Sequence, residues 1–141
     1  MSTIPFLQLR DYTPEDYPML CEWWKGHGWE AVPELMLPKL GVIVDEFDAY
    51  GFPKPIAASF LYMDNSCGVA MMEWTVSNPK AAGRTTLKAI STIIEFLSIS
   101  AKEMNYAVIL TTCKQQSLSR VFEKGKFIRT DSEMIHLIKP L

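Results

Sequence analysis

The sequence has few of the residues that build metal centres and disulfide frameworks. It contains two histidines and three cysteines in 141 residues. Neither histidine has a partner at a zinc-like spacing, and Cys21, Cys67 and Cys113 are odd in number and far apart. Widely separated cysteines of odd number favour reduced thiols in the cytosol. The sequence therefore predicts no metal site and a cytoplasmic protein.

Long apolar runs and an excess of one charge are also missing. No run reaches the roughly 18 residues of a membrane-spanning helix, and the first residues lack the charged and apolar regions of a signal peptide. The formal net charge is -2, so the chain has no basic field that would attract nucleic acid or a membrane surface. Small molecules and other proteins remain as partners.

Acidic residues are absent from residues 79–94, where the longest predicted helix begins. Three cations, Lys80, Arg84 and Lys88, lie in this stretch instead. A helix N-terminus carries about half a positive charge from its aligned peptide dipoles, so carboxylates are usual there. Unpaired amides, the dipole and three cations together suit an anion such as phosphate. A solvated basic helix start is the alternative.

The composition is that of an ordinary globular protein, with 48% hydrophobic and 21% charged residues. A chain of 141 residues is long enough to bury a core without disulfide or metal support. No repeat, low-complexity segment or linker divides it. We therefore expect a single domain spanning residues 1–141.

The strand-turn-helix stretch of residues 69–104 is the centre of the predicted fold. Side chains alternate along a strand, so one face is expected to carry Ala70, Met72, Trp74 and Val76, and the other Met71, Glu73 and Thr75. The helix has apolar residues at the spacing of a buried stripe, namely Leu87, Ile90, Ile94, Leu97, Ala101 and Met104.

The remaining patterns predict a mixed α/β order. Strands are expected at residues 6–10, 41–45 and 56–63, and a helix at residues 13–28 with Thr13 as its N-cap. The apolar run at residues 106–112 predicts a strand buried on both faces and parallel to the strand at 69–76. A short helix at 117–124 and one or two strands at 126–138 close the chain.

Three segments are distinctive: EWTVSNP before the long helix, SLSRVFEKGKF near the end, and DYPMLCEWWKGHGW in the first helix. Together they resemble the GNAT superfamily of N-acyltransferases, and in particular the small GNAT-like proteins encoded by bacteriophages. The resemblance spans essentially the whole chain. It implies a mixed central sheet of about six to seven strands flanked by about four helices, and a location in the host cytoplasm.

The resemblance also implies a function. We expect an acetyl-CoA-dependent N-acetyltransferase, in which an amine attacks the thioester directly within a ternary complex. A catalytically degenerate CoA-binding or protein-interaction module of phage origin is the alternative. The acceptor, a small amine or a protein amino group, is set in this fold by the first helix, the 29–40 loop and the closing strands. Pairing through the final strands would make a homodimer.

Positions of the acetyl-CoA site follow from the resemblance. The pantetheine arm would pair with the backbone of Trp74, Thr75 and Val76. The pyrophosphate would meet the amides of Gly83, Arg84, Thr85 and Thr86, helped by the side chains of Lys80, Arg84 and Thr85. The family's glycine pattern is incomplete here. If Gly83 takes the first glycine position, Thr85 takes the second. If the alignment is made on Pro79 instead, Thr85 and Leu87 take the two glycine positions. The usual proton-donating tyrosine corresponds to Phe122, which cannot donate a proton.

Glu73 is the candidate catalytic base. A primary amine is protonated at neutral pH, so a base must take a proton before the amine attacks. Apolar or weakly polar neighbours would bury Glu73 and raise its pKa towards the range that is useful for a base. A strand carboxylate paired with a cation is the alternative. His27 is a second candidate base, or a histidine favoured by a helix C-terminus. The tryptophans at 23, 24, 29 and 74 are expected in the core or in an acceptor-pocket wall.

Overall fold

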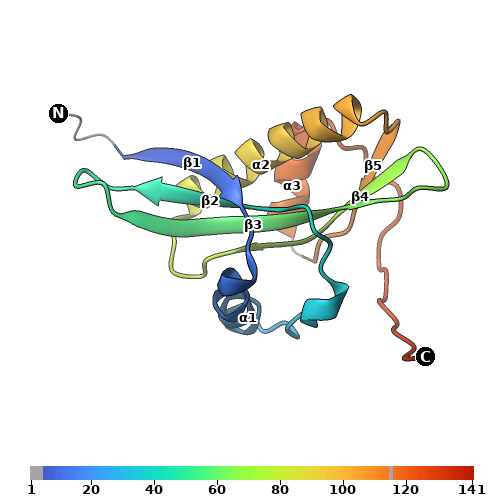
Figure 1. The fold of residues 1–141 in the computed structure, drawn as a ribbon, viewed down its shortest axis with the longest axis horizontal. Coiled ribbons are helices and arrows are strands. Elements are labelled where there is room, and N and C mark those ends of the chain that lie inside the picture. The colour runs from blue at the N-terminus through green and yellow to red at the C-terminus, as the bar shows by residue number, and fades with distance from the viewer. Residues whose placement is uncertain (1–4, 115) are drawn as a thin grey trace.

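The structure is a computed structural model that describes residues 5–114 and 116–141. One five-stranded sheet has the order β1-β2-β3-β4-β5, with α2 and α3 on one face and α1 on the other (Figure 1). The strands are β1 (Phe6–Asp11), β2 (Gly41–Phe47), β3 (Pro53–Met63), β4 (Val69–Ser77) and β5 (Val108–Thr111). The α-helices are α1 (Tyr17–Gly26), α2 (Gly83–Glu103) and α3 (Gln116–Lys124), and the 3-10 turns are η1 (Pro14–Asp16) and η2 (Glu34–Met36).

The mixed α/β class expected from the sequence is confirmed. The described residues form five strands and three α-helices, rather than six to seven strands and about four helices. Within these residues no helix is long and apolar enough to cross a membrane.

Strand pairing opens the sheet between β4 and β5. The first four strands pair antiparallel, whereas β4 and β5 are parallel, as the sequence predicts. Their pairing runs from Val69 opposite Val108 to Met72 opposite Thr111 and then stops. β4 continues to Ser77 without a β5 neighbour, and we call the unpaired side of residues 73–77 the β4–β5 gap.

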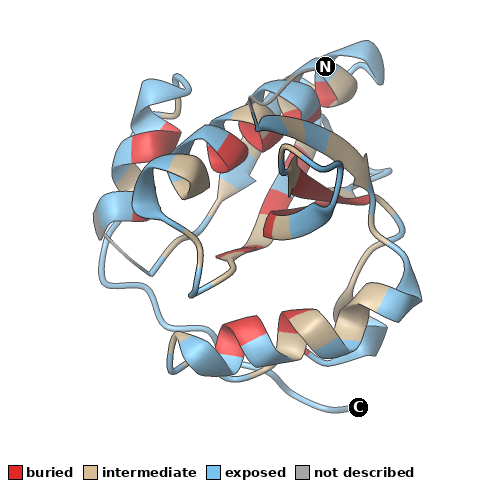
Figure 2. Ribbon diagram, turned by 90° about the vertical axis from the view of Figure 1, so that its left-hand side faces the viewer, coloured by how far each residue is buried: buried red, intermediate tan, exposed pale blue. Residues whose placement is uncertain are grey.

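Two apolar cores lie on the two faces of the sheet. The core beneath α2 and α3 contains Val44, Leu61 and Met72 from the strands, and the core beneath α1 contains Ile43 and Phe60. Neighbouring strand residues thus enter opposite cores, as the two-residue period of a strand requires. Figure 2 shows the buried segments of the helices facing the sheet.

The buried stripe of α2 differs from the predicted one at its ends. The helix buries Ala89, Ile90, Ile93, Ile94, Leu97 and Ala101. Leu87 and Met104 are 46% and 41% exposed, so their predicted burial is wrong. Leu87 lines a cavity beside β4. Met104 is the C-cap residue at the end of the helix.

Two predictions fail at the β5 side of the sheet. Residues 126–138 contain no strand, although their sequence favours one. The strand expected over 106–112 is β5, and it is not buried on both faces, because Val108 and Leu110 are 50% and 52% exposed. Within the described chain β5 is therefore the last strand of the sheet, and nothing pairs with its outer edge.

Candidate functional site

A β-bulge at Trp74 shapes the open end of β4. Ala58 pairs with Val76 and Phe60 pairs with Glu73, so β4 has one extra residue between these pairs. Trp74 has φ 62°, a left-handed conformation that a bulky side chain rarely adopts. The surrounding contacts must therefore hold this residue in place.

The bulge overturns the alternation predicted for the strand. Met72 packs in the core beneath α2, whereas Val76 packs in the core beneath α1, with Trp74 against it. Thr75 is buried, and its Oγ1 lies 2.7 Å from Ser59 Oγ. The predicted faces are therefore correct as far as Glu73 and reversed beyond it, because one inserted residue shifts the two-residue period.

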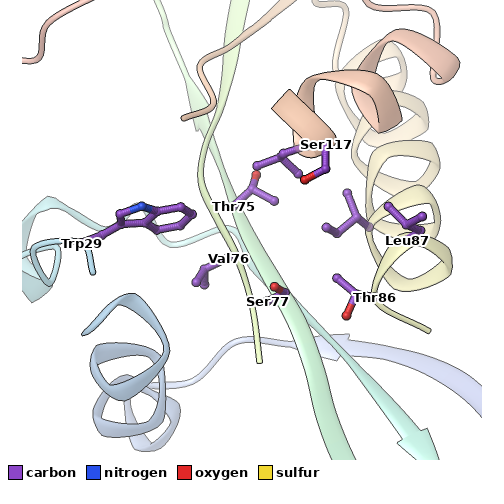
Figure 3. Close-up of a pocket in the computed structure, with 9 residues that line it drawn as sticks. Trp29, Thr75, Val76, Ser77, Thr86, Leu87 and Ser117 are labelled. Atoms are coloured by element: carbon purple, nitrogen blue, oxygen red, sulfur yellow. The ribbon is translucent and has the colours of Figure 1, made fainter. Parts of the chain in front are cut away.

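A cavity of about 50 Å³ occupies the gap beyond the last β4–β5 pair. Its wall comes from β4, the first turns of α2, the start of α3 and the loop after α1: Trp29, Thr75, Val76, Ser77, Thr86, Leu87, Ile90, Ser117 and Leu118. Figure 3 shows Trp29 on one side of β4 and Thr86 and Leu87 on the other. A space of this size holds roughly one or two water molecules.

The N-terminus of α2 adjoins this cavity and lacks a side-chain cap. The N-cap residue is Ala82, and the first turn has no acidic residue, as the sequence indicates. A serine or aspartate there would accept hydrogen bonds from the first amides, whereas alanine leaves them available. Lys80 and Arg84 are exposed beside them. An anion here would meet free amides, the helix dipole and two cations.

Asn78 holds the turn that leads from β4 to this helix, a role that the sequence analysis missed. Its Nδ2 donates to Pro55 O at 3.0 Å, and its Oδ1 accepts from the Lys80 amide at 3.0 Å. An asparagine followed by proline after a strand is a turn signal, so the sequence contained a cue. The side chain fixes where α2 starts relative to the end of β4.

Glu73 lies next to the bulge, on the sheet face opposite Met72. Thr112 Oγ1 donates a hydrogen bond to Glu73 Oε1 at 3.3 Å. Burial raises the pKa of Glu73 to about 7, and the bond from Thr112 opposes this rise. Among the described residues no ion pair includes Glu73. The carboxyl group is therefore able to gain or lose a proton near neutral pH.

Aromatic side chains surround the bulge on the α1 face. Trp74 Nε1 donates to Tyr62 OH at 2.7 Å, and Tyr62 OH donates to Met36 O. His136 meets the Trp74 ring edge-on at 5.8 Å between centroids. The sequence analysis missed Tyr62 and Thr112, because only the fold brings Tyr62 next to Trp74 and Thr112 next to Glu73.

His27 lies at the C-terminal end of α1, which is the position that the sequence analysis gives as the alternative to a catalytic base. Its Nε2 is 2.9 Å from Ser77 O, and its ring stacks on Trp29 at 4.7 Å. Lys114, in the loop after β5, has its Nζ 5.4 Å from the centre of the Trp29 ring. These contacts tie the loop after α1 to both sides of the β4–β5 gap.

The other singled-out residues are distributed between core and site. Trp23 and Trp24 are buried in the core, whereas Trp29 and Trp74 are half-buried beside the gap. Phe122 is buried and packs edge-on against Phe127 at 5.2 Å.

Solved structures match this fold across nearly the whole chain. A probable acetyltransferase aligns over 95% of this chain and 97% of its own, at 14% identity and a TM-score of 0.63. A predicted acetyltransferase with acetyl-CoA, from Clostridium acetobutylicum, aligns over 94% and 96%, at 18% identity and 0.60. A transcriptional regulator from Bacillus halodurans aligns over 94% and 100%, at 13% identity and 0.65. No family model and no curated protein matches the sequence.

At these identities the likeness shows the fold. Several of the matching structures are acetyltransferases, and one is a GNAT-family protein from Streptococcus pneumoniae. The chain therefore has the GNAT-like fold that its sequence resembles. Activity depends on the site itself.

Proposed function

We propose that this chain is a single GNAT-like domain that transfers an acetyl group from acetyl-CoA to an amine. One observation carries the proposal: the β4–β5 gap has an uncapped, cationic helix start at one end and the titratable carboxyl of Glu73 at the other. The first suits a diphosphate, and the second suits a base for an ammonium group. The acetyltransferases among the matching structures support the same assignment.

The chain's own groups fit the acyl donor. The amides of Gly83, Arg84 and Thr85 would bind the pyrophosphate, with the side chains of Lys80, Arg84 and Thr85 beside it. The Thr86 amide, which the sequence analysis also expects at this site, already donates to Ala82 O at 2.9 Å. The backbone of Trp74, Thr75 and Val76 would bind the pantetheine arm, since β5 leaves this stretch unpaired. The cavity of about 50 Å³ is smaller than that arm, so binding requires side chains that line the cavity to move apart.

The reaction needs the amine in its neutral form. Acetyl-CoA supplies the reactive thioester, and Glu73 takes the proton that the attacking ammonium group loses. A pKa of about 7 keeps a large fraction of the carboxyl ionised at neutral pH and still basic enough to accept that proton. Phe122 supplies no proton, so the departing thiolate must be protonated by solvent or by another group.

Binding of acetyl-CoA is the first test, with calorimetric titration as the measurement. We expect micromolar binding that Arg84→Glu weakens at least tenfold, because the variant puts a carboxylate where the pyrophosphate lies. Lys102→Glu is the matched control: it makes the same change of charge in the last turn of α2 and should leave binding unchanged. Equal binding by the Arg84 variant and the parent chain would rule out the phosphate position.

Transfer itself is tested by thiol release over a panel of amines and peptides. We expect release with the parent chain and a loss of at least a hundredfold in Glu73→Gln. Binding of acetyl-CoA without thiol release for any acceptor would instead support a degenerate CoA-binding protein. Thr85 at a glycine position and Phe122 at the position of the proton-donating tyrosine would then explain the lost activity.

A further inference from the structure

The α1 face of the sheet carries a row of exposed apolar side chains at its β5 end. We call Met71 of β4 together with Val108 and Leu110 of β5 the apolar strip. Their neighbours in sequence Met72 and Ile109 pack in the core beneath α2, so the strip residues point to the opposite face. They are 37%, 50% and 52% exposed, and Figure 1 shows that α1 lies away from β5.

The apolar strip begins beside the carboxyl of Glu73. Glu73 follows Met71 by two residues on the same face of β4, and Thr112 follows Leu110 by two residues on the chain of β5. Thr112 Oγ1 donates to Glu73 Oε1 at 3.3 Å, so the two positions lie side by side. A strand advances about 3.3 Å per residue, which puts Met71 about 7 Å from Glu73 along the strand.

Glu73 supplies the charge at this end of the strip. Burial raises its pKa to about 7, and no cation among the described residues lowers it or forms an ion pair with it. Lys114 and His136 contact the rings of Trp29 and Trp74 instead. An ammonium group would complement the carboxyl, and the rest of the molecule that carries it would lie on apolar side chains.

The polar groups on the β3 side of the carboxyl already have partners. Tyr62 pairs with Met71 across the sheet. Its hydroxyl accepts from Trp74 Nε1 at 2.7 Å and donates to Met36 O. Neither the phenol nor the indole therefore has a proton left to donate to a substrate. Their rings remain, and aromatic rings suit an ammonium group or an apolar body.

We propose that the amine acceptor is a small monoamine with an apolar body, whose ammonium group meets Glu73 while its body lies on Met71 and Leu110. The inference rests on the proposed acetyl transfer. A second ammonium group would lie against apolar side chains and lose its hydration without a partner. A carboxylate beside the amine would be repelled by Glu73.

This position of the acceptor suits the transfer step. The amine lies on the α1 face at the start of the β4–β5 gap, where the thioester of acetyl-CoA is proposed to lie. Glu73 takes the first proton from the ammonium group, and the nitrogen then forms a bond to the acetyl carbon. The carbon–sulfur bond breaks, and coenzyme A leaves as a thiolate that takes the second proton of the nitrogen through solvent.

Comparison of four amines tests the proposed class, with kcat/KM from thiol release at pH 8.5 as the measurement. We expect 2-phenylethylamine to exceed each of the other three at least tenfold. Ethylamine lacks the ring, phenylalanine adds one carboxylate to the same skeleton, and 1,4-diaminobutane replaces the ring by a second ammonium group. Each pair thus isolates one property of the acceptor.

A charge placed on the apolar strip should reverse the preference. Leu110→Glu puts a second carboxylate beside Met71, so we expect it to lower kcat/KM for 2-phenylethylamine at least tenfold and to raise it for 1,4-diaminobutane. Ile99→Glu is the matched control, because Ile99 is 51% exposed on α2, and it should change neither value. Both variants should bind acetyl-CoA as the parent does. Met71→Glu replaces Leu110→Glu if the latter does not fold by circular dichroism.

Calorimetric titration with 2-phenylethylamine in the presence of coenzyme A measures acceptor binding without reaction. Binding that Leu110→Glu weakens tenfold, without thiol release for any amine, would support the strip and refute acetyl transfer. Transfer that is equal for the four amines, that favours 1,4-diaminobutane or that is confined to peptides would overturn the strip and leave acetyl transfer standing. Failure of 2-phenylethylamine both to bind and to react would likewise overturn the strip.

Discussion

Replacing Glu73 by glutamine is expected to stabilise the protein at high pH. In the folded chain burial raises the pKa of Glu73 from 4.5 to about 7. The folded state therefore holds this proton more tightly than the unfolded state does. Stability falls as pH rises from about 4.5 to about 7, because the unfolded chain has already lost a proton that the folded chain still holds.

The magnitude follows from the same pKa values. At 1.36 kcal/mol per pKa unit, the rise from 4.5 to about 7 corresponds to about 3 kcal/mol. Because Glu73 is only half-buried, solvent screening reduces this to about 1–2 kcal/mol. Glutamine keeps the shape of the side chain and an oxygen that accepts the bond from Thr112, but it has no charge to desolvate. The variant should therefore be more stable than the parent by this amount at pH 8.

Urea unfolding at several pH values measures the effect. The difference in midpoint between Glu73→Gln and the parent should be about 0.5–1 M urea at pH 8, for an m-value of about 2 kcal/mol/M, and should disappear near pH 4.5. Glu95→Gln, at an exposed position of α2, is the control and should show no such trend. A Glu73→Gln difference that stays constant with pH would refute the placement of a buried, titrating carboxyl at this site.

Three further predictions concern the reaction, the core and the turn before α2. The kcat/KM for acetyl transfer by the parent should rise through pH 7, following ionisation of Glu73. Thiol release measured over a range of pH tests this, and a kcat/KM that does not change around pH 7 would show that another group is the base. Leu97→Ala removes a fully buried side chain and should cost about 2–5 kcal/mol in urea unfolding, whereas Leu35→Ala, at a 91% exposed position, should cost less than about 0.5 kcal/mol. Asn78→Ala removes two side-chain hydrogen bonds and should lower the free energy of unfolding by about 1–3 kcal/mol. It should also weaken acetyl-CoA binding, and unchanged binding would show that this turn does not position the cofactor site.

Periodicity predicted the parts of the fold in which each element packs on a continuous surface. The middle of α2 lies over the sheet, so the helical stripe correctly identified Ile90, Ile94 and Leu97 as buried. The stripe failed at Leu87 because the sheet beneath the first turn has opened. Helical spacing describes the helix alone and contains no information about where its support ends.

The site was predicted in part, because the charge pattern of α2 depends on local sequence and the surroundings of Glu73 depend on the fold. The absence of acid before and within the first turn is visible in the sequence and is present in the structure. The contact between Glu73 and Thr112 joins residues 39 positions apart. Parallel pairing of β4 and β5 creates it, and a single sequence shows that pairing only as an expectation.

The two clearest failures of local pattern have opposite physical origins. At Trp74 the chain adopts φ 62°, against the preference of a bulky residue, and the hydrogen bond from its indole to Tyr62 helps to hold it there. Contacts within the fold thus override the alternation. In the tail the local pattern favours a strand, but the described residues 126–138 form none, because they contact α3 and Trp74 and do not follow the free edge of β5. A strand pattern is therefore realised only where the rest of the fold supplies an edge that the segment can follow.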